Sequence, residues 1–470
     1  MIRVTTSDGE LEASSLPSGI QLFAGIPFAA PPVGPLRLRP PQPVTPWPRV
    51  RDATRYGPAP LQAAGGDEDC LYLNVWTPST EGARPVLFWL FGGGFEGGSA
   101  SPPGTDAALL AERLDCVVVA ANYRLGALGF LHLPGLGAVN LGLQDVVAAL
   151  RWVQVNASAV GGDPRRVTVG GVSAGAFCVG SLLAIPSAKG LFSQAVLHSG
   201  SAGRTFTTEI ADSIARDLVA ALDLTEPNEL LDVDASRLVA LQTTVIAQDI
   251  GERNLPGGRS WGLVVDGHVL PEPPLDAVTR GDSRDVPLLV CATRDEVQLY
   301  EVLHAVAYPP ADEAAFLAEM GKVHTAPPRL LAAYRERSPN ASLARLRSHF
   351  LSDVIYRRPA TALADAQVAA GGRAWSSLHT SAPAGNALGA CHGSDMAYLF
   401  EGTVHPMVPP LPREHFPVRD RMLAAFRRFL HEGDPGWQQH GSGRTYDYGT
   451  GALVSEPPAD GVAAAWVAGA

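Results

Sequence analysis

The sequence has little charge and no long hydrophobic run. Asp, Glu, Lys and Arg make up 18% of its 470 residues, and no segment reaches the roughly 18 uncharged apolar residues that a membrane-spanning helix needs. The 36 Lys and Arg are outnumbered by 47 Asp and Glu, which gives a formal net charge of −11. The basic residues form no cluster with interleaved aromatics. A nucleic-acid-binding face is therefore excluded, because phosphate neutralisation needs a basic surface.

Cysteine is scarce as well. The five cysteines are Cys70, Cys116, Cys178, Cys291 and Cys391. Their number is odd, their spacings are wide and no two form a CxxC pair, so we expect no zinc site and predict reduced thiols, as in cytoplasmic proteins. The opening segment MIRVTTSDGELEASS has no basic stretch followed by an apolar run, so no signal peptide is expected and the predicted location is cytoplasmic.

Hydrophobic residues make up 46% of the chain, enough for a large core. Many occur in continuous apolar runs, which are typical of parallel strands buried on both faces. The runs lie at 85–91, 116–122, 166–171, 194–199, 286–292 and 373–379. Helical spacing or helix-end signals predict helices at 141–158, directly after Ser173, and at 418–433. Alternating strands and helices predict an α/β fold: a large, mostly parallel sheet with helices on both faces, in one domain over 1–470.

One strand ends in the segment VTVGGVSAGAF, residues 167–177. A strand, then Gly-x-Ser-x-Gly, then a helix is the pattern of a nucleophile elbow, a tight turn that exposes the hydroxyl of Ser173. Gly171 and Gly175 leave room for the crowded backbone, and the helix N-terminus directs N–H groups at a developing oxyanion. The pattern therefore predicts an α/β-hydrolase fold with Ser173 as nucleophile.

A second glycine-rich segment, LFGGGFEGGS at 90–99, follows the strand predicted at 85–91. The N–H groups of Gly93 and Gly94, together with that of Ala174, are placed to form an oxyanion hole. A phosphate-binding loop is the alternative, but no GK[ST] sequence follows the glycines.

The sequence identifies the acid and the base of the triad less clearly than the nucleophile. The order nucleophile, acid, histidine favours a late His among the 12 present, and His392 in GACHGSDMAYLF lies beyond the last predicted strand. Asp295 and Glu296 end the strand before it, and spacing alone does not choose between them.

Taken together, these segments resemble the type-B carboxylesterases, the family of the cholinesterases and the bacterial para-nitrobenzyl esterases. The resemblance covers nearly the whole chain. The matching strings are GIPFAAPPVGPLRLRPPQPVTPW (25–47), EDCLYLNVWTP (68–78), FGGGFEGGS (91–99), NYRLGALGFL (122–131), NLGLQDVVAALRWVQVNASAVGGDPRRVTVGGVSAGA (140–176), AVLHSGS (195–201) and VVDGHVLPEPP (264–274).

The resemblance implies a role for several residues. It places the acid on Glu296, the base on His392 and the oxyanion donors on Gly93, Gly94 and Ala174. It also implies that Ser199 hydrogen-bonds the acid and that Arg37 pairs with Glu68 as part of the scaffold.

The chain departs from the family pattern in several places. Phe91 replaces a His or Tyr, Val172 replaces a Glu, and Cys291 and Val297 replace two glycines that flank the acid. The segment ahead of Cys70 is too short for the cysteine-closed loop of the family, so we expect a free thiol there.

The resemblance implies a serine carboxylesterase, without cofactor or metal, and we expect a bacterial one. Val172 is apolar and the stretch 59–70 has no aromatic residue, so two sources of attraction for a cation are missing, and we expect neutral, small to medium esters as substrates. An amidase, carbamate hydrolase or acyltransferase with the same triad is one alternative, and a non-catalytic binding module is another. A small-molecule ester is the expected partner, and we expect a monomer or small homo-oligomer.

Overall fold

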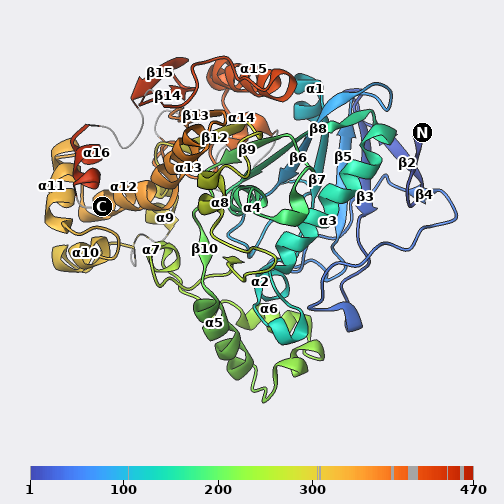
Figure 1. Ribbon diagram of the computed structural model, residues 1–470, viewed down its shortest axis with the longest axis horizontal. Coiled ribbons are helices and arrows are strands. Elements are labelled where there is room, and N and C mark those ends of the chain that lie inside the picture. The colour runs from blue at the N-terminus through green and yellow to red at the C-terminus, as the bar shows by residue number, and fades with distance from the viewer. Residues whose placement is uncertain are drawn as a thin grey trace.

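A twisted sheet crosses the molecule from one side to the other (Figure 1). The computed structural model describes residues 2–103, 105–303, 305, 308–382, 386–400, 411–441, 443–455 and 460–468. Within those ranges the sheet has thirteen strands, in the order β1-β2-β3-β5-β7-β6-β8-β9-β12-β13-β14-β15, with β4 paired to β2.

The middle of the sheet is parallel. In sheet order its strands are β7 (Val117–Ala121), β6 (Arg84–Leu90), β8 (Gly162–Val172), β9 (Gln194–His198), β12 (Leu288–Thr293), β13 (Ala374–His379) and β14 (Arg444–Asp447). All six apolar runs of the sequence lie in these strands, and the predicted parallel sheet is confirmed. Their residues are almost wholly buried because helices cover both faces.

The flanks of the sheet, which are antiparallel except for the parallel pairing of β4 with β2, were not assigned from the sequence. At the N-terminal side they are β1 (Ile2–Thr6), β2 (Gly9–Ser15), β3 (Gln21–Pro27), β4 (Arg51–Asp52) and β5 (Tyr72–Thr77), and at the far edge β15 (Ala452–Ser455) pairs with β14. β1 and β2 form a hairpin with only every second residue buried. Such short, half-buried strands carry much weaker apolar runs than the central ones.

Helices pack on both faces of the sheet. α1 (Ala108–Leu114) and α15 (Phe416–Glu432) contact each other over one face, and α3 (Leu141–Asn156), α4 (Ala174–Leu182), α8 (Pro274–Arg280) and α13 (Arg358–Ala369) cover the other (Figure 1). The three helices expected from the sequence are α3, α4 and α15. α15 ends at Glu432, with Gly433 in a left-handed conformation as its C-cap.

The remaining helices lie mainly between β9 and β13 and beyond β13. They are α2 (Gly126–Phe130), α5 (Thr208–Ala221), α6 (Ala235–Leu241), α7 (Ile250–Asn254), α9 (Gln298–Leu303), α10 (Glu313–Met320), α11 (Pro327–Arg337), α12 (Leu343–Ser352), α14 (Met396–Leu399) and α16 (Asp460–Val467), with the short strands β10 (Thr205–Phe206) and β11 (Leu263–Val264). In Figure 1, α5 and α6 extend below the sheet, and α10 to α12 lie beside it with the C-terminal α16.

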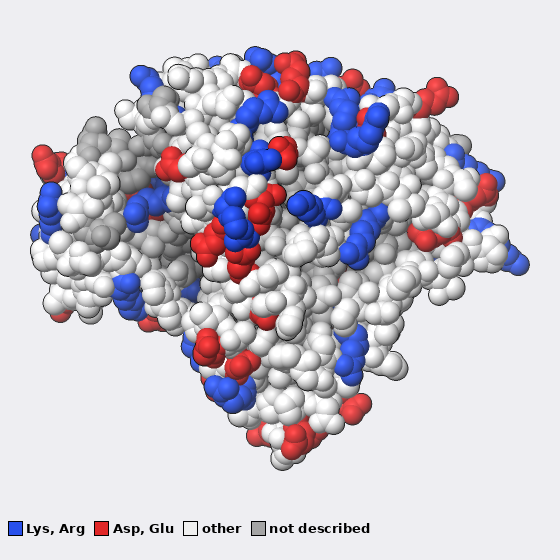
Figure 2. Space-filling model, viewed as in Figure 1, with Lys and Arg blue, Asp and Glu red and all other residues white. Residues whose placement is uncertain are grey.

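The surface drawn in Figure 2 carries basic and acidic residues interspersed, without a large area of one sign. In the part of the chain that the structure describes, no helix is long and apolar enough to cross a membrane.

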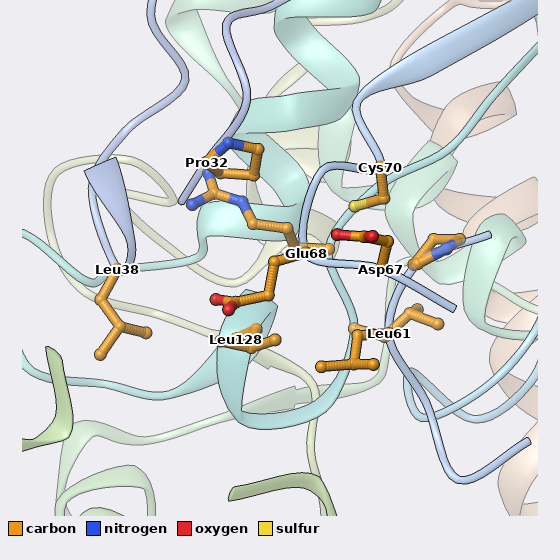
Figure 3. A pocket seen from close by; sticks show the side chains of 10 residues that line it. Pro32, Leu38, Leu61, Asp67, Glu68, Cys70 and Leu128 are labelled. Atoms are coloured by element: carbon orange, nitrogen blue, oxygen red, sulfur yellow. The ribbon is translucent and has the colours of Figure 1, made fainter. Parts of the chain in front are cut away.

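Arg37 and Glu68 form the scaffold pair that the sequence suggested. Two parallel hydrogen bonds join them, from Arg37 Nε to Oε1 at 2.7 Å and from Nη2 to Oε2 at 2.6 Å. Glu68 lies with Asp67 and Cys70 around a crevice of about 10 Å³ (Figure 3), which is no larger than one water molecule. Arg37 also donates to backbone carbonyls at Leu231 and Val233, so the pair ties the N-terminal segment to the helices below the sheet.

All five cysteines are free and buried. Burial raises the pKa of the Cys70, Cys116, Cys178 and Cys391 thiols, that of Cys391 to about 12. We predict that a disulfide reagent such as Ellman's reagent reacts with fewer than one thiol per native chain at pH 7.5, because the reactive thiolate is both rare and inaccessible. In guanidinium chloride, the unfolded chain should react with the reagent at all five thiols. Rapid stoichiometric labelling of the native protein at Cys70 would contradict the burial of that thiol.

Candidate active site

Ser173 occupies the turn between β8 and α4 with φ 56° and ψ −121°. Its amide donates to the carbonyl of His198 at 2.9 Å, which ties the turn to the neighbouring strand β9. The glycines of the motif are required by packing. A Cβ on Gly171 would lie 2.7 Å from the carbonyl carbon of Gly175, and one on Gly175 would lie 2.2 Å from Leu90 O. The small residues therefore allow the sharp turn that exposes Ser173.

The structure brings together His392 and Glu296, which are 96 residues apart. His392 Nδ1 and Glu296 Oε2 lie 2.7 Å apart, and the His392 amide donates to the carbonyl of Glu296 at 3.1 Å. Glu296 is fully buried, and its second carboxylate oxygen accepts from the Thr293 amide at 2.8 Å. A buried carboxylate held in this way fixes the orientation of the imidazole and stabilises its protonated form.

Asp295 has a different environment, although it is adjacent in sequence. Its Oδ2 accepts from the Ala390 amide at 2.9 Å and forms an ion pair with Arg294 at 3.0 Å. Asp295 and Cys391 form a parallel β-bridge that aligns the two segments. The structure thus distinguishes the two carboxylates between which the sequence spacing did not choose. Glu296 contacts His392, and Asp295 holds the backbone of the loop that carries His392.

The glycine-rich segment after β6 forms a tight loop beside Ser173. Gly93 and Gly94 have φ values of 130° and 66°, conformations that other residues rarely adopt. Among the described residues, no atom accepts a hydrogen bond from the amides of Gly93, Gly94 or Ala174. These three amides are available to an oxyanion. Phe91 stacks on Tyr123 at 4.5 Å between ring centroids, and Tyr123 Oη donates to Phe91 O at 2.8 Å, which anchors the start of the loop.

Ser173, His392 and the glycines Gly92 to Gly94 line one cavity of about 520 Å³. The apolar part of its wall includes Trp89, Phe91, Val172, Leu299, Met396 and Phe400. Its charged part is Glu96 and Arg253, which form an ion pair with 2.8 Å between Arg253 Nη1 and Glu96 Oε1. The size suits a small molecule.

Ser199 does not make the contact with the acid that the resemblance implies. The residue is buried with φ 49°, and its amide donates to Cys291 O at 2.8 Å. Its hydroxyl makes no hydrogen bond with any described residue. The Thr293 amide, one turn ahead of Glu296, supplies the hydrogen bond to the acid instead.

Two residues near His392 were missed by the sequence-based predictions. The ring of Tyr356 lies 4.7 Å from that of His392, between centroids. Asp395, three residues after His392, pairs with His198 at 2.6 Å in a fully buried contact. Burial opposes the charge on His198, but neighbouring Cys291 and Asp395 raise its pKa to about 10. Against the effect of burial, the bond to His198 lowers the pKa of Asp395. The HGSD sequence hints at Asp395, whereas nothing near the motifs indicates Tyr356.

Comparison with known proteins agrees with this geometry. Residues 2–445 match the model of the carboxylesterase family. The chain belongs to the carboxylesterase family. The resemblance seen in the sequence is therefore confirmed, and with it the α/β-hydrolase fold.

Relatives within the carboxylesterase family cover most of the chain. A fumonisin B1 esterase of Sphingopyxis macrogoltabida is 35% identical over 84% of this chain and 74% of its own length. A para-nitrobenzyl esterase of Bacillus subtilis (strain 168) is 36% identical over 77% of this chain and 76% of its own length. The crystal structure of the Geobacillus stearothermophilus carboxylesterase EST55 at pH 6.2 superposes with a TM-score of 0.90 at 32% identity and covers 99% of this chain and 100% of that chain.

We predict that Glu296→Gln lowers kcat/KM for a para-nitrophenyl ester by about 10³–10⁴-fold, because the neutral amide no longer stabilises the imidazolium. Asp295→Asn keeps an oxygen that can accept from the Ala390 amide and should lose less than about tenfold. Initial rates of both purified variants, with circular dichroism as the folding control, make the comparison. A larger loss in Asp295→Asn than in Glu296→Gln contradicts the assignment of the acid.

Proposed function

We propose that Ser173, His392 and Glu296 are the catalytic triad of this carboxylic ester hydrolase. The observation that carries the proposal is the 2.7 Å contact between His392 and the buried Glu296, beside a cavity that Ser173 also lines. The amides of Gly93 and Gly94 at the same cavity, and that of Ala174 directly after Ser173, have no acceptor among the described residues and support the oxyanion hole.

The reaction follows from this arrangement. Ser173 Oγ attacks the carbonyl carbon of the ester while His392 takes its proton, and Glu296 stabilises the resulting imidazolium. The amides of the oxyanion loop bind the negative oxygen of the tetrahedral intermediate. His392 then gives the proton to the leaving alcohol, and an acyl-enzyme remains on Ser173. A water molecule then attacks the acyl-enzyme while His392 takes its proton. His392 gives this proton to Ser173 Oγ, and the carboxylic acid is released. The chemistry needs no cofactor or metal.

We propose neutral esters of small to medium size as substrates. Val172, directly before the nucleophile, is apolar. Among the described residues that line the cavity, Glu96 is the one that carries a carboxylate. Because Glu96 is paired with Arg253, it offers no free negative charge to a cationic substrate. The half-buried Arg204, whose guanidinium lies 5.3 Å from the centre of the Phe95 ring and 5.5 Å from that of Phe177, adds a positive charge near the oxyanion loop.

Three further expectations remain proposals. A single domain over 1–470 is supported by one buried cluster that extends from Val4 to Trp466. A cytoplasmic location in a bacterium is supported by five free thiols and by bacterial relatives. A monomer or small homo-oligomer is the assembly that we propose, to be tested by light scattering.

The nucleophile is tested by Ser173→Ala. We predict a folded protein that has lost nearly all ester hydrolysis, because no other residue can form the acyl-enzyme. An organophosphate should modify Ser173 alone in the native enzyme, as mass spectrometry of the peptides would show. Activity retained in the variant, or labelling of another serine, rejects the mechanism. A matched ester and anilide pair, assayed together, separates an esterase from an amidase with the same triad.

The charge preference is tested by acetylcholine and its uncharged isostere 3,3-dimethylbutyl acetate. We predict that kcat/KM for acetylcholine does not exceed that for the isostere, because no unpaired carboxylate of the described cavity wall attracts the ammonium group. The two constants are measured at low and moderate salt. A preference for the cation of about tenfold that fades with salt would contradict the proposal.

A further inference from the structure

The long helical segment beyond the acid contains an irregular turn. α12 (Leu343–Ser352) continues into a π-helical turn, Asp353–Arg357, and then into α13 (Arg358–Ala369). Single π-turns inside α-helices widen the backbone and change which side chains face a given neighbour. Here the turn packs against the segment 293–297, which carries Glu296.

Two hydrogen bonds, one from the residue directly before this turn and one from its last residue, hold the backbone on either side of Glu296. Ser352 Oγ accepts from the Val297 amide at 3.0 Å, directly after the acid. Arg357 Nη1 donates to the carbonyl of Arg294, two residues before the acid. The same Ser352 hydroxyl donates to Ser348 O at 2.6 Å, which fixes its orientation.

The turn also contacts the base. The Tyr356 ring lies against His392 with an angle of 39° between the ring planes. Its neighbour Phe177, on α4 one turn beyond the nucleophile, lies 6.4 Å from Tyr356 between centroids. One short stretch of helix therefore touches the elements that carry the nucleophile, the acid and the base.

A buried network anchors the turn itself. Arg357 and Asp353 form an ion pair at 2.6 Å with exposed side-chain fractions of 2% and 0%. Asp353 Oδ2 accepts from Tyr334 Oη at 2.6 Å, and Tyr334 Oη accepts from Trp466 Nε1 at 3.1 Å. The contacts link α11 and the C-terminal α16 to the acid-bearing segment. Burying this many polar groups is costly unless each is held in place.

The other hydrogen bonds of the acid-bearing segment run within the segment, to His379 and to the loop that carries His392. Ser199 does not hydrogen-bond the acid, and bulkier Cys291 and Val297 stand near it where the family pattern has glycines. Correct placement of a triad carboxylate matters because a displacement of about 1 Å can cost about 10²-fold in rate.

We propose that Ser352 and Arg357, at the start and the end of the π-helical turn, are positioning residues that set the backbone of Glu296 and so its alignment with His392. The proposal rests on the proposed function, because it acts through Glu296 as the acid of the triad. Neither residue touches the substrate; both act on the geometry of the acid.

The test uses Ser352→Ala and a matched control, Ser342→Ala. Ser342 caps the other end of the same helix, where its hydroxyl accepts from the Arg345 amide at 3.2 Å. Each variant removes one serine-to-amide hydrogen bond. We expect Ser352→Ala to lower kcat for a para-nitrophenyl ester by about tenfold, the effect of one lost hydrogen bond, with KM changed less than about twofold. Ser342→Ala should leave both constants within about twofold of the parent.

A second arm separates positioning from stability. Ser352→Ala is combined with Glu296→Gln, and the residual rate is compared with that of Glu296→Gln alone. If Ser352 acts through the acid, the combination loses less than about twofold further. Equal kcat values for Ser352→Ala and Ser342→Ala, or a full additional loss in the combined variant, would overturn the proposal. Full activity of Glu296→Gln alone would instead reject Glu296 as the acid, which is a failure of the proposed function.

Arg357 is tested by Arg357→Lys, which keeps the charge beside Asp353 but removes the planar group that reaches both Asp353 and Arg294 O. We expect a lower kcat with KM retained. Because a buried ion pair is altered, the thermal midpoint is measured alongside, and Ser352→Ala remains decisive if Arg357→Lys does not fold. An unchanged kcat in a folded Arg357→Lys variant contradicts a positioning role for this residue.

Discussion

The backbone conformation of Ser173 is the constraint on which the rest of the site depends. A φ of 56° with a ψ of −121° is unfavourable for an L-residue, and it persists only where its surroundings determine it. Those surroundings are the ends of β6, β8 and β9 and the first turn of α4. A Cβ on Gly92 would lie 2.8 Å from Val172 O, and one on Gly200 would lie 2.5 Å from Ala176 Cβ. The parallel sheet therefore supplies a rigid, closely packed frame that holds the proposed nucleophile in a strained turn.

The proposed acid and base, Glu296 and His392, lie outside that frame, on segments that follow β12 and β13. Strand order brings these ends together, since β12 pairs with both β9 and β13. The precise contact between Glu296 and His392 then depends on local hydrogen bonds: from the Thr293 amide to the carboxylate, and between the backbones of His392 and Glu296. A carboxylate without exposure to solvent interacts strongly with the imidazolium that forms beside it, because no water screens the two charges.

The sequence predicts the centre of the fold and much of the site because both are encoded locally. Continuous apolar runs identified the six inner strands that lead to the site, and the glycine patterns located Ser173 and the oxyanion loop. The choice of Glu296 over Asp295 needed the family resemblance, since adjacent residues carry the same chemistry and only the path of the backbone separates them. Ser352, Tyr356 and Arg357 had no such signal. They lie in a helical segment more than fifty residues beyond Glu296 in the sequence. No local sequence pattern indicates that this segment contacts the site. The hydrogen bond expected from Ser199 is not formed, although the residue lies at the end of β9 as its motif requires.

Polar contacts connect the three segments that carry Ser173, Glu296 and His392 to one another. The buried His198–Asp395 pair joins β9 to the segment that carries His392. The carbonyl of the same His198 accepts from the Ser173 amide. The π-helical turn joins the acid to α11 and α16. An apolar contact allows small displacements at little cost, whereas a buried ion pair or hydrogen bond has a narrow range of length and direction. Placing such contacts around the triad gives each segment a fixed position, which is the property that transition-state stabilisation by preorganised groups requires.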